Sequence, residues 1–243
     1  MLFRSHQSSS QAIVNWQSFN IGSAATVNVH QPGVSASLLN RVTAGAPSKI
    51  FGSLRANGQV FLVNPSGIIF GNGARVDVGG LVASSLSIKD EDFLTGNLSF
   101  SGGGSGGIEN HGFIRGGNVA LLGPEIRNDG EILATVGSVG LASGDKATLT
   151  FEDNNLISIA VEESTLKSAI ENAGRVVAEN GSVMLRASAA DSLVDGLIKS
   201  NPGATGLVSE NGTVRLVSVS GSIAANTIEI DAGSRGEIGR AHV

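Results

Sequence analysis

The amino-acid sequence predicts an all-β chain wound into a β-solenoid, in which short strands stack coil upon coil. Three observations predict this fold: alternating apolar and polar segments recur, glycine or Asn-Gly follows most of them, and one short unit repeats. Period-two alternation of β-branched residues is the pattern of a half-buried strand. Repeats too small to bury their own apolar face must stack on their neighbours, as the coils of a solenoid do.

The alternating segments lie throughout the chain. They are Thr26–Val29, Arg75–Val78, Ser138–Leu141, Ser182–Leu185, Thr213–Leu216 and Thr227–Ile230. Asn-Gly pairs punctuate them, and we expect these pairs to turn the chain with a positive φ at the glycine. The pairs are Asn57-Gly58, Asn72-Gly73, Asn180-Gly181 and Asn211-Gly212.

The repeating unit is Ile-x-Asn-x-Gly followed by Gly-x-Val-x-Leu. Copies begin at Ile108, Ile126 and Ile170, and a looser copy begins at Leu207. The step from 108 to 126 is 18 residues and the step from 126 to 170 is 44, which indicates an insertion. Stacking would align Asn110, Asn128 and Asn172 as a side-chain ladder at one corner. It would also point six apolar side chains of parallel strands into the lumen, namely Val139, Leu141, Val183, Leu185, Val214 and Leu216.

Two segments interrupt the strand pattern. Ser87–Gly96 offers a cap candidate, early acidic residues (Asp90, Glu91 and Asp92) and a late glycine, and so predicts a short helix. Ser101–Gly107, with the sequence SGGGSGG, predicts a flexible loop between strands of one kind. Its glycines 102, 104 and 107 satisfy G-x-G-x-x-G, but no strand–turn–helix context surrounds them, so nucleotide binding is not predicted.

Composition excludes several function classes. The net charge is -5 and lysine and arginine are scattered, which disfavours a nucleic-acid groove. No apolar run approaches the roughly 18–20 residues that span a bilayer. The absence of cysteine excludes disulfides and thiolate metal sites, and suits a chain that is exported unfolded through a pore. Aromatic residues make up only 4%, which suits a narrow lumen filled by Val, Ile and Leu.

The sequence offers no catalytic, cofactor-binding or metal site, and we expect no enzyme. The histidines are widely separated, at His6, His30, His111 and His242. A polysaccharide-cleaving β-helix would need clustered acids beside a base on neighbouring coils. The arginines Arg115, Arg127, Arg175 and Arg186 show no matching set of acids, so a solvated face is the better interpretation.

The two ends of the chain differ from the rest. Leu2–Ser5 and Glu237–Ala241 can be encoded by reverse-complementary stretches that look like a common sequencing adaptor. We therefore interpret residues 1–5 and 237–243 as translated adaptor and 6–236 as one domain. Leu2–Ser5 and Ile238–Val243 are expected to make few contacts and to join no coil.

The stretch from Val60 to Phe70 has a clear physical interpretation. Val60–Val63 predicts a buried strand, and Ile68–Phe70 predicts re-entry into the core. Between them, Asn64-Pro65-Ser66-Gly67 predicts a turn, because proline fixes φ, glycine supplies a positive φ, and Asn and Ser bond back to the backbone. The amide of Asn64 can both cap the turn and present a donor and an acceptor to a partner. The turn is therefore a corner needed for folding, part of a surface that a partner meets, or both, since export through a pore is coupled to folding.

Asn40–Ile69, NRVTAGAPSKIFGSLRANGQVFLVNPSGII, continues as FGNGARVDVGGLVASSLSI. This run resembles the haemagglutination-activity, or two-partner secretion, domain of the filamentous haemagglutinin family of large exoproteins. Ala12–Gly22, Gly144–Val161 and Ile170–Ala187 fit the same family. The family's Asn-Pro-Asn-Gly-Ile motif corresponds to Asn64, Pro65, Ser66, Gly67 and Ile68, with serine in the middle. Asn40, Arg41, Asn57 and Gly58 match supporting positions of the family motif.

The resemblance implies a right-handed parallel β-helix with short extra-helical strands. It implies a secretion domain that the periplasmic polypeptide-transport domains of a Gram-negative outer-membrane β-barrel transporter recognise. Strand addition to the transporter could drive this recognition. The domain would initiate export and folding of a long passenger that reaches the cell surface or medium and contacts a host receptor. We expect a monomer that lacks the family's opening cap strands.

Two other functions remain open. One is a direct adhesin that binds a host glycan or receptor, which an exposed aromatic or basic groove would favour. The less favoured one is a polysaccharide-active β-helix enzyme.

Overall fold

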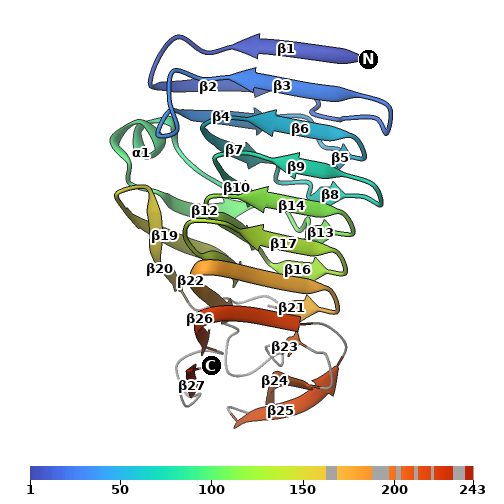
Figure 1. Cartoon of the computed structure of the whole chain (residues 1–243), viewed down its shortest axis with the longest axis vertical. Coiled ribbons are helices and arrows are strands. Elements are labelled where there is room, and N and C mark those ends of the chain that lie inside the picture. The colour runs from blue at the N-terminus through green and yellow to red at the C-terminus, as the bar shows by residue number, and fades with distance from the viewer. Residues whose placement is uncertain are drawn as a thin grey trace.

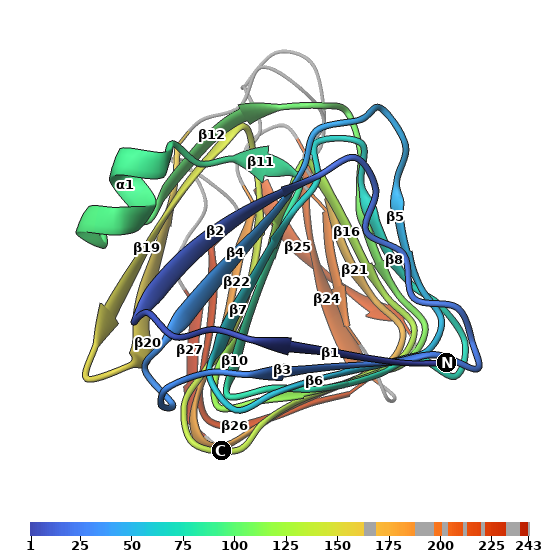
Figure 2. The same ribbon diagram turned by 90° about the horizontal axis from the view of Figure 1, so that it is seen from above.

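The computed structural model describes residues 1–162, 169–187, 197–200, 204–210, 213–219, 222–231 and 239–242. The fold is an all-β, right-handed parallel β-helix, with strands stacked along the long axis (Figure 1). Seen from one end, the coils superpose as a triangle with three strand faces (Figure 2). This confirms the predicted solenoid and its parallel pairing.

Each face is a ladder of parallel strands. The first face contains β1 (Leu2–His6), β3 (Thr26–His30), β6 (Ser53–Ala56), β9 (Arg75–Asp77), β14 (Phe113–Gly116), β17 (Glu131–Ala134) and the first half of β22 (Arg175–Ala187). The second face contains β2 (Gln11–Trp16), β4 (Ser37–Val42), β7 (Gln59–Val63), β10 (Gly80–Ser84), β15 (Val119–Gly123), β18 (Val139–Ser143) and the second half of β22. The third face contains β5 (Ser48–Ile50), β8 (Ile68–Phe70), β13 (Ile108–Asn110), β16 (Glu125–Asn128), β21 (Ala169–Asn172) and β23 (Leu197–Ser200).

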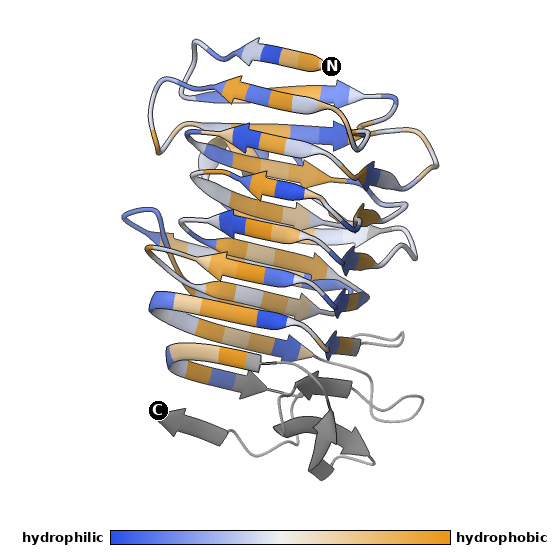
Figure 3. Cartoon of the chain, turned by 45° about the vertical axis from the view of Figure 1, so that its right-hand side comes forward, coloured by the Kyte–Doolittle hydropathy of each residue, from blue (hydrophilic) through white to orange (hydrophobic). Residues whose placement is uncertain are grey.

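The lumen is filled by aliphatic side chains from all three faces together with Phe70, and hydrophobic positions recur strand after strand down the stack (Figure 3). Leu141 pairs in register with Leu185, and Val139 with Val183. All four side chains are fully buried in one core cluster, as predicted. Removal of this apolar surface from water is the main stabilising term of the coil stack.

The fourth predicted repeat is placed differently. Val214 and Leu216 belong to β25 (Thr213–Val219), which pairs antiparallel with β24 (Ala204–Glu210), so their expected position on parallel strands is wrong. Their side chains lie outside the described part. The coil is continued by β26 (Ser222–Asp231), whose register places Ile228 beside Val183 and Ile230 beside Leu185. The alternating run in β26 therefore occupies the ladder positions expected for the fourth repeat.

The predicted asparagine ladder is confirmed at the corner where the third face ends. Asn110, Asn128 and Asn172 pair in register and are buried. The Asn110 Nδ2 donates to Asn128 Oδ1 at 2.7 Å, and the Asn128 Nδ2 donates to Asn172 Oδ1 at 2.6 Å. The amides of Asn110 and Asn128 both donate and accept, so the ladder satisfies polar groups that would otherwise be costly to bury.

An antiparallel sheet covers the outside of the second face (Figure 2). Its strands are β11 (Leu86–Ser87), β12 (Ser99–Gly103), β19 (Lys146–Glu152) and β20 (Asn155–Val161). We call Leu86–Gly107 the excursion, because it leaves the coil after β10 and returns at β13. Side chains from the sheet and from the outer side of the second face form a second apolar cluster. The second face is thus buried on both sides, which explains why β10, β15 and β18 are apolar without strict alternation.

The predicted helix is present as α1 (Asp90–Thr95), with three acidic residues in its first turn and Gly96 in the left-handed conformation at its end. The residue at the N-cap position is Lys89, which makes no side-chain cap bond. The segment Gly144–Val161, which fits the family, forms the antiparallel hairpin of β19 and β20.

Two of the four predicted Asn-Gly turns, at Gly58 and Gly181, need glycine for another reason. Gly73 has the expected positive φ of 85°, but Gly58 and Gly181 do not. A Cβ on Gly58 would lie 2.5 Å from the carbonyl oxygen of Ala36, and one on Gly181 would lie 2.2 Å from that of Gly137. Backbones of successive coils approach too closely at this corner for any side chain. Gly212 lies outside the described residues.

The two ends do join the fold, contrary to expectation. β1 pairs parallel with β3 from Leu2 to His6, and β27 (Gly239–His242) pairs antiparallel with β26. Leu2 and Phe3 stay largely exposed. The pairing of β1 uses main-chain groups, which every sequence carries, at an open strand edge. The adaptor origin of residues 1–5 and 237–243 therefore stays a prediction.

The four arginines expected to lack acid partners are all ion-paired. Arg115 Nη1 lies 3.4 Å from Asp77 Oδ1, and Arg175 pairs with Glu131. Parallel register places each of these carboxylates on the neighbouring coil beside its arginine. Arg127 Nε lies 2.8 Å from Asp129 Oδ2, and this hydrogen bond raises the pKa of Arg127. Arg186 pairs with Glu229 at 2.8 Å.

Candidate functional site: the turn between β7 and β8

The predicted turn, Asn64–Gly67, lies where the second face passes into the third. The amide of Gly67 donates to the carbonyl oxygen of Asn64 at 2.9 Å, and Asn64 Oδ1 accepts the amide hydrogen of Ser66 at 3.0 Å. Gly67 has a φ of 105°. Val60–Val63 and Ile68 are buried, as predicted. Serine replaces the family's second asparagine without loss of the turn, because both turn bonds use Asn64 and the backbone.

The side chain of Asn64 is 0% exposed. Its Nδ2 donates to the carbonyl oxygen of Ala46 and to Ser48 Oγ, both at 3.0 Å. Both the amide nitrogen and the amide oxygen of Asn64 therefore bond inside the folded domain, and a role of Asn64 in recognition by a partner stays a prediction. Sequence reasoning missed Ser48, which is 1% exposed, because nothing in its local sequence marks it as a partner of Asn64.

The other side of the turn is covered by the returning end of the excursion. The amide of Ile68 donates to the carbonyl oxygen of Gly107 at 3.1 Å. A Cβ on Gly104 would lie 2.0 Å from Pro65 O, and one on Gly106 would lie 2.2 Å from the carbonyl carbon of Ser66. The glycine-rich segment is therefore no free loop: Ser101–Gly103 belongs to β12, and Gly104–Gly107 packs backbone against backbone on the turn.

Asn40 and Arg41 lie on β4. Asn40 is buried, accepts from Trp16 Nε1 at 3.1 Å and donates to the carbonyl oxygen of Phe61 at 3.3 Å. The guanidinium of Arg41 donates to the carbonyl oxygen of Ile88 at 2.8 Å and lies 2.6 Å from Asp90 Oδ1. Arg41 therefore fastens the outgoing end of the excursion to the second face.

Asn57 and Gly58 lie apart from the turn, where the first face passes into the second. Asn57 exchanges two hydrogen bonds with the backbone of Gln31, at 2.8 Å and 2.9 Å. The amide of Gly58 donates to Gln31 Oε1 at 3.0 Å. Gln31 is buried and organises this corner, yet no feature of the sequence singled it out.

A groove of about 470 Å³ follows the same corner up to the hairpin tip at Asp153 and Asn154. No aromatic side chain lines it, and Arg115 in its wall is paired with Asp77. This groove therefore lacks the aromatic or free basic surface that would favour the adhesin alternative.

The described residues contain no group of three or more His, Asp or Glu placed to hold a metal ion. His6 and His30 are nevertheless neighbours, because β1 and β3 pair in register and their rings stack at 5.0 Å. Within the part of the chain that is described, no helix is long and apolar enough to cross a bilayer.

A three-faced coil stack, a sheet laid over one face and a buried Asn-Pro-x-Gly corner define the class to which this chain belongs. It is a member of the TPS secretion domain family, whose model matches residues 4–238. This is a family of secretion domains and not of enzymes. Its members are domains of large exoproteins that an outer-membrane transporter secretes to the cell surface or medium.

Two similar proteins are heme/hemopexin-binding proteins of Haemophilus influenzae. The first, from strain Rd, is 34% identical over 192 residues, covering 72% of this chain and 20% of the relative. The second is 33% identical over 237 residues, covering 86% of this chain and 25% of the relative. The chain thus spans a fifth to a quarter of the length of these relatives.

The fold is similar to the crystal structure of the HMW1 secretion domain from Haemophilus influenzae. The TM-score is 0.69 and the identity 31%, with 80% of this chain and 56% of the other covered.

Proposed function

We propose that the transporter recognises this domain before it folds, and that the Asn64–Ile68 motif acts afterwards, by completing the folded β-helix. In this view export is driven forward by folding on the outer side of the membrane. The single observation that supports the proposal is the full burial of Asn64, whose amide has no free donor or acceptor in the folded domain.

Recognition of an unfolded chain fits the chemistry of the strands. Segments such as β7 and β8 have main-chain groups that pair in the folded coil and are free before folding. We propose that they add as strands to the periplasmic polypeptide-transport domains of the transporter. Once the coils close, the same groups are paired within the domain, so the folded domain no longer competes for the transporter.

The exported protein as a whole is the subject of a second proposal. Heme/hemopexin binding is the activity named for two relatives. We propose it as the first activity to assay in the longer protein, with contact to a host-surface receptor as the alternative. The domain itself is proposed to act as a monomer.

The proposal on the motif is tested with Asn64→Ala in the full exoprotein, co-expressed with its transporter. The substitution removes bonds to Ala46, Ser48 and the Ser66 amide, and leaves buried polar groups unpaired. We expect a loss of about 2–4 kcal/mol in the free energy of unfolding. Secretion is measured as the exported fraction by immunoblot, and stability by urea melts of the purified domain.

Asn128→Ala is the matched control. It breaks the buried amide ladder, far along the chain from the motif, at a similar expected cost. If Asn64 acts through folding, the two variants lose secretion in proportion to their lost stability. A much lower secretion of Asn64→Ala at equal stability would mean that the transporter contacts Asn64 directly. Secretion of Asn64→Ala at the parent level would show that Asn64 has no role in export, either through folding or through recognition.

A further inference from the structure

We infer that the excursion Leu86–Gly107 is a latch, and that Arg41 and Gly106 are positioning residues for the turn. The latch is fastened at its start to Arg41 and at its end to Asn64–Gly67. The two parts of the family motif, which are separate in sequence, would thereby act as one unit. The inference rests on the proposed function only in giving the turn a role in export.

The outgoing end of the excursion is held by coils that precede it in the chain. One guanidinium, that of Arg41, contacts Asn15 Oδ1 at 3.2 Å, the carbonyl oxygen of Ile88 at 2.8 Å and Asp90 Oδ1 at 2.6 Å. The Arg41 side chain is only 19% exposed, so its bond to a backbone carbonyl is sheltered from water. A planar fork with several donors suits this three-way contact better than the single ammonium of a lysine.

The middle of the excursion is anchored by apolar packing. Phe93 of α1 is buried and meets Phe61 of β7 edge to face, with ring centroids 5.2 Å apart. Gln11 Nε2 of β2 donates to the carbonyl oxygen of Phe93 at 3.2 Å. Figure 2 shows α1, β11 and β12 outside the triangle, alongside the second-face strands. The excursion therefore touches both coils on which the motif residues lie, through Arg41 of β4 and Phe61 of β7, and also the preceding coil through Gln11 of β2.

The returning end closes on the turn itself. Gly104 and Gly106 approach the backbone of Pro65 and Ser66 so closely that no Cβ fits, and Gly107 accepts the Ile68 amide at 3.1 Å. Ala46 and Ser48 cover the other side of the turn and precede it in sequence. Gly104 follows Gly67 by 37 residues in the sequence. A chain that is exported N-terminus first therefore presents the turn residues before the Gly104–Gly107 segment that packs on them.

This order has a consequence for folding. The turn is complete only when the excursion has packed on the second face and returned to the coil. The coils up to β8 alone therefore cannot protect the amides of the turn fully from hydrogen exchange. Because the start of the excursion is held by Arg41, weakening that end should also loosen the far end on the turn. Two contacts joined by one packed element are expected to be energetically coupled.

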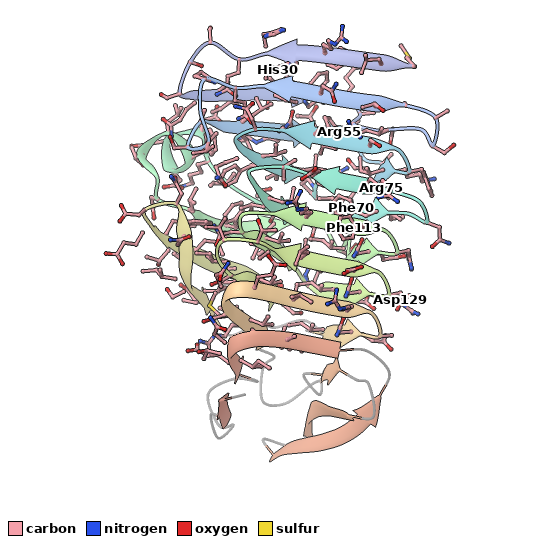
Figure 4. All side chains as sticks on the ribbon, in the orientation of Figure 1. His30, Arg55, Phe70, Arg75, Phe113 and Asp129 are labelled. Carbon is pink, nitrogen blue, oxygen red and sulfur yellow. The ribbon has the colours of Figure 1, made fainter. Side chains whose placement is uncertain are left out.

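Amide hydrogen exchange of the whole chain tests this coupling without any transporter. Arg41→Gln should accelerate exchange at least tenfold at the Ile68 amide as well as at the Phe93 amide, which bonds to Lys89 O. The amides of Glu131 and Arg175, bonded to Gly112 O and Gly130 O at the remote corner, should be unchanged. Arg75→Gln is the control, because Arg75 is exposed on the first face and has no ion pair with any described residue (Figure 4).

Asp90→Asn is a milder second variant that removes only the partly exposed ion pair. It should also accelerate exchange at the Ile68 and Phe93 amides, by a smaller factor, and leave the two remote amides unchanged. This variant replaces Arg41→Gln in the test if Arg41→Gln does not fold. Faster exchange at Phe93 with none at Ile68 would overturn the latch, since the two ends would then be independent. Equal acceleration at all four amides would overturn it too, since Arg41 would then stabilise the whole domain. If exchange at both ends is accelerated but Arg41→Gln is secreted normally, the latch stands and only the proposed role of the turn in export is contradicted.

Discussion

Leu185→Asp is expected to lower the free energy of unfolding by more than about 4 kcal/mol, a large part of the roughly 5–15 kcal/mol that stabilises a typical domain. Leu185 is 0% exposed and lies in the lumen beside Leu141, where no described basic side chain could pair with a carboxylate. The aspartate must either stay protonated or open the coil to water. Urea melts followed by circular dichroism measure the loss.

The control for this prediction is Val136→Asp. Val136 is 63% exposed and lies between β17 and β18, so the same kind of carboxylate meets water there. We expect a change of less than about 0.5 kcal/mol. If Leu185→Asp costs less than about 1 kcal/mol, Leu185 does not point into a dry lumen.

Gly106→Ala carries the second large effect, about 3 kcal/mol, from one added methyl group. Its Cβ would lie 2.2 Å from the Ser66 carbonyl carbon and 2.3 Å from the Gly67 nitrogen. Both are backbone atoms of the turn, so no side-chain rotation relieves the clash. Thermal melts of the purified domain should show a clear drop in Tm.

Gly33→Ala is the matched control for Gly106→Ala. An added Cβ on Gly33 meets nothing within 4 Å, and Gly33 does not have a positive φ. Alanine there should be neutral or should stabilise the domain slightly by restricting the unfolded chain. Equal melting temperatures for the two variants would show that Gly104–Gly107 does not pack on the turn.

The sequence predicted those features that follow from repetition. Asn110, Asn128 and Asn172 occupy the same place in each repeat, so stacking alone aligns them. Val139, Leu141, Val183 and Leu185 follow from the same register. The turn at Asn64 was also predictable, because proline, glycine and asparagine each restrict the backbone locally.

Features that depend on contacts between segments far apart in the chain could not be predicted from the local sequence pattern. The glycine run at 104–107 reads as a flexible loop unless one knows that it returns onto Pro65 and Ser66. The burial of Asn64 depends on Ser48, which belongs to the preceding coil. Both β25 and β26 contain alternating runs of similar character. The local pattern therefore does not show that β26, and not β25, continues the parallel ladder.

The most direct test of the central claim uses the fact that the chain contains no cysteine. Ser48→Cys places a single thiol of nearly the same size beside Asn64, at a position that is 1% exposed in the folded domain. The rate of maleimide labelling is measured on the folded, secreted protein and on the chain held by the periplasmic domains of its transporter. The account predicts slow labelling of the secreted protein and fast labelling of the transporter-held chain, because the turn forms only after recognition. Equally slow labelling in both states would contradict it, since the turn would then be folded when the transporter binds.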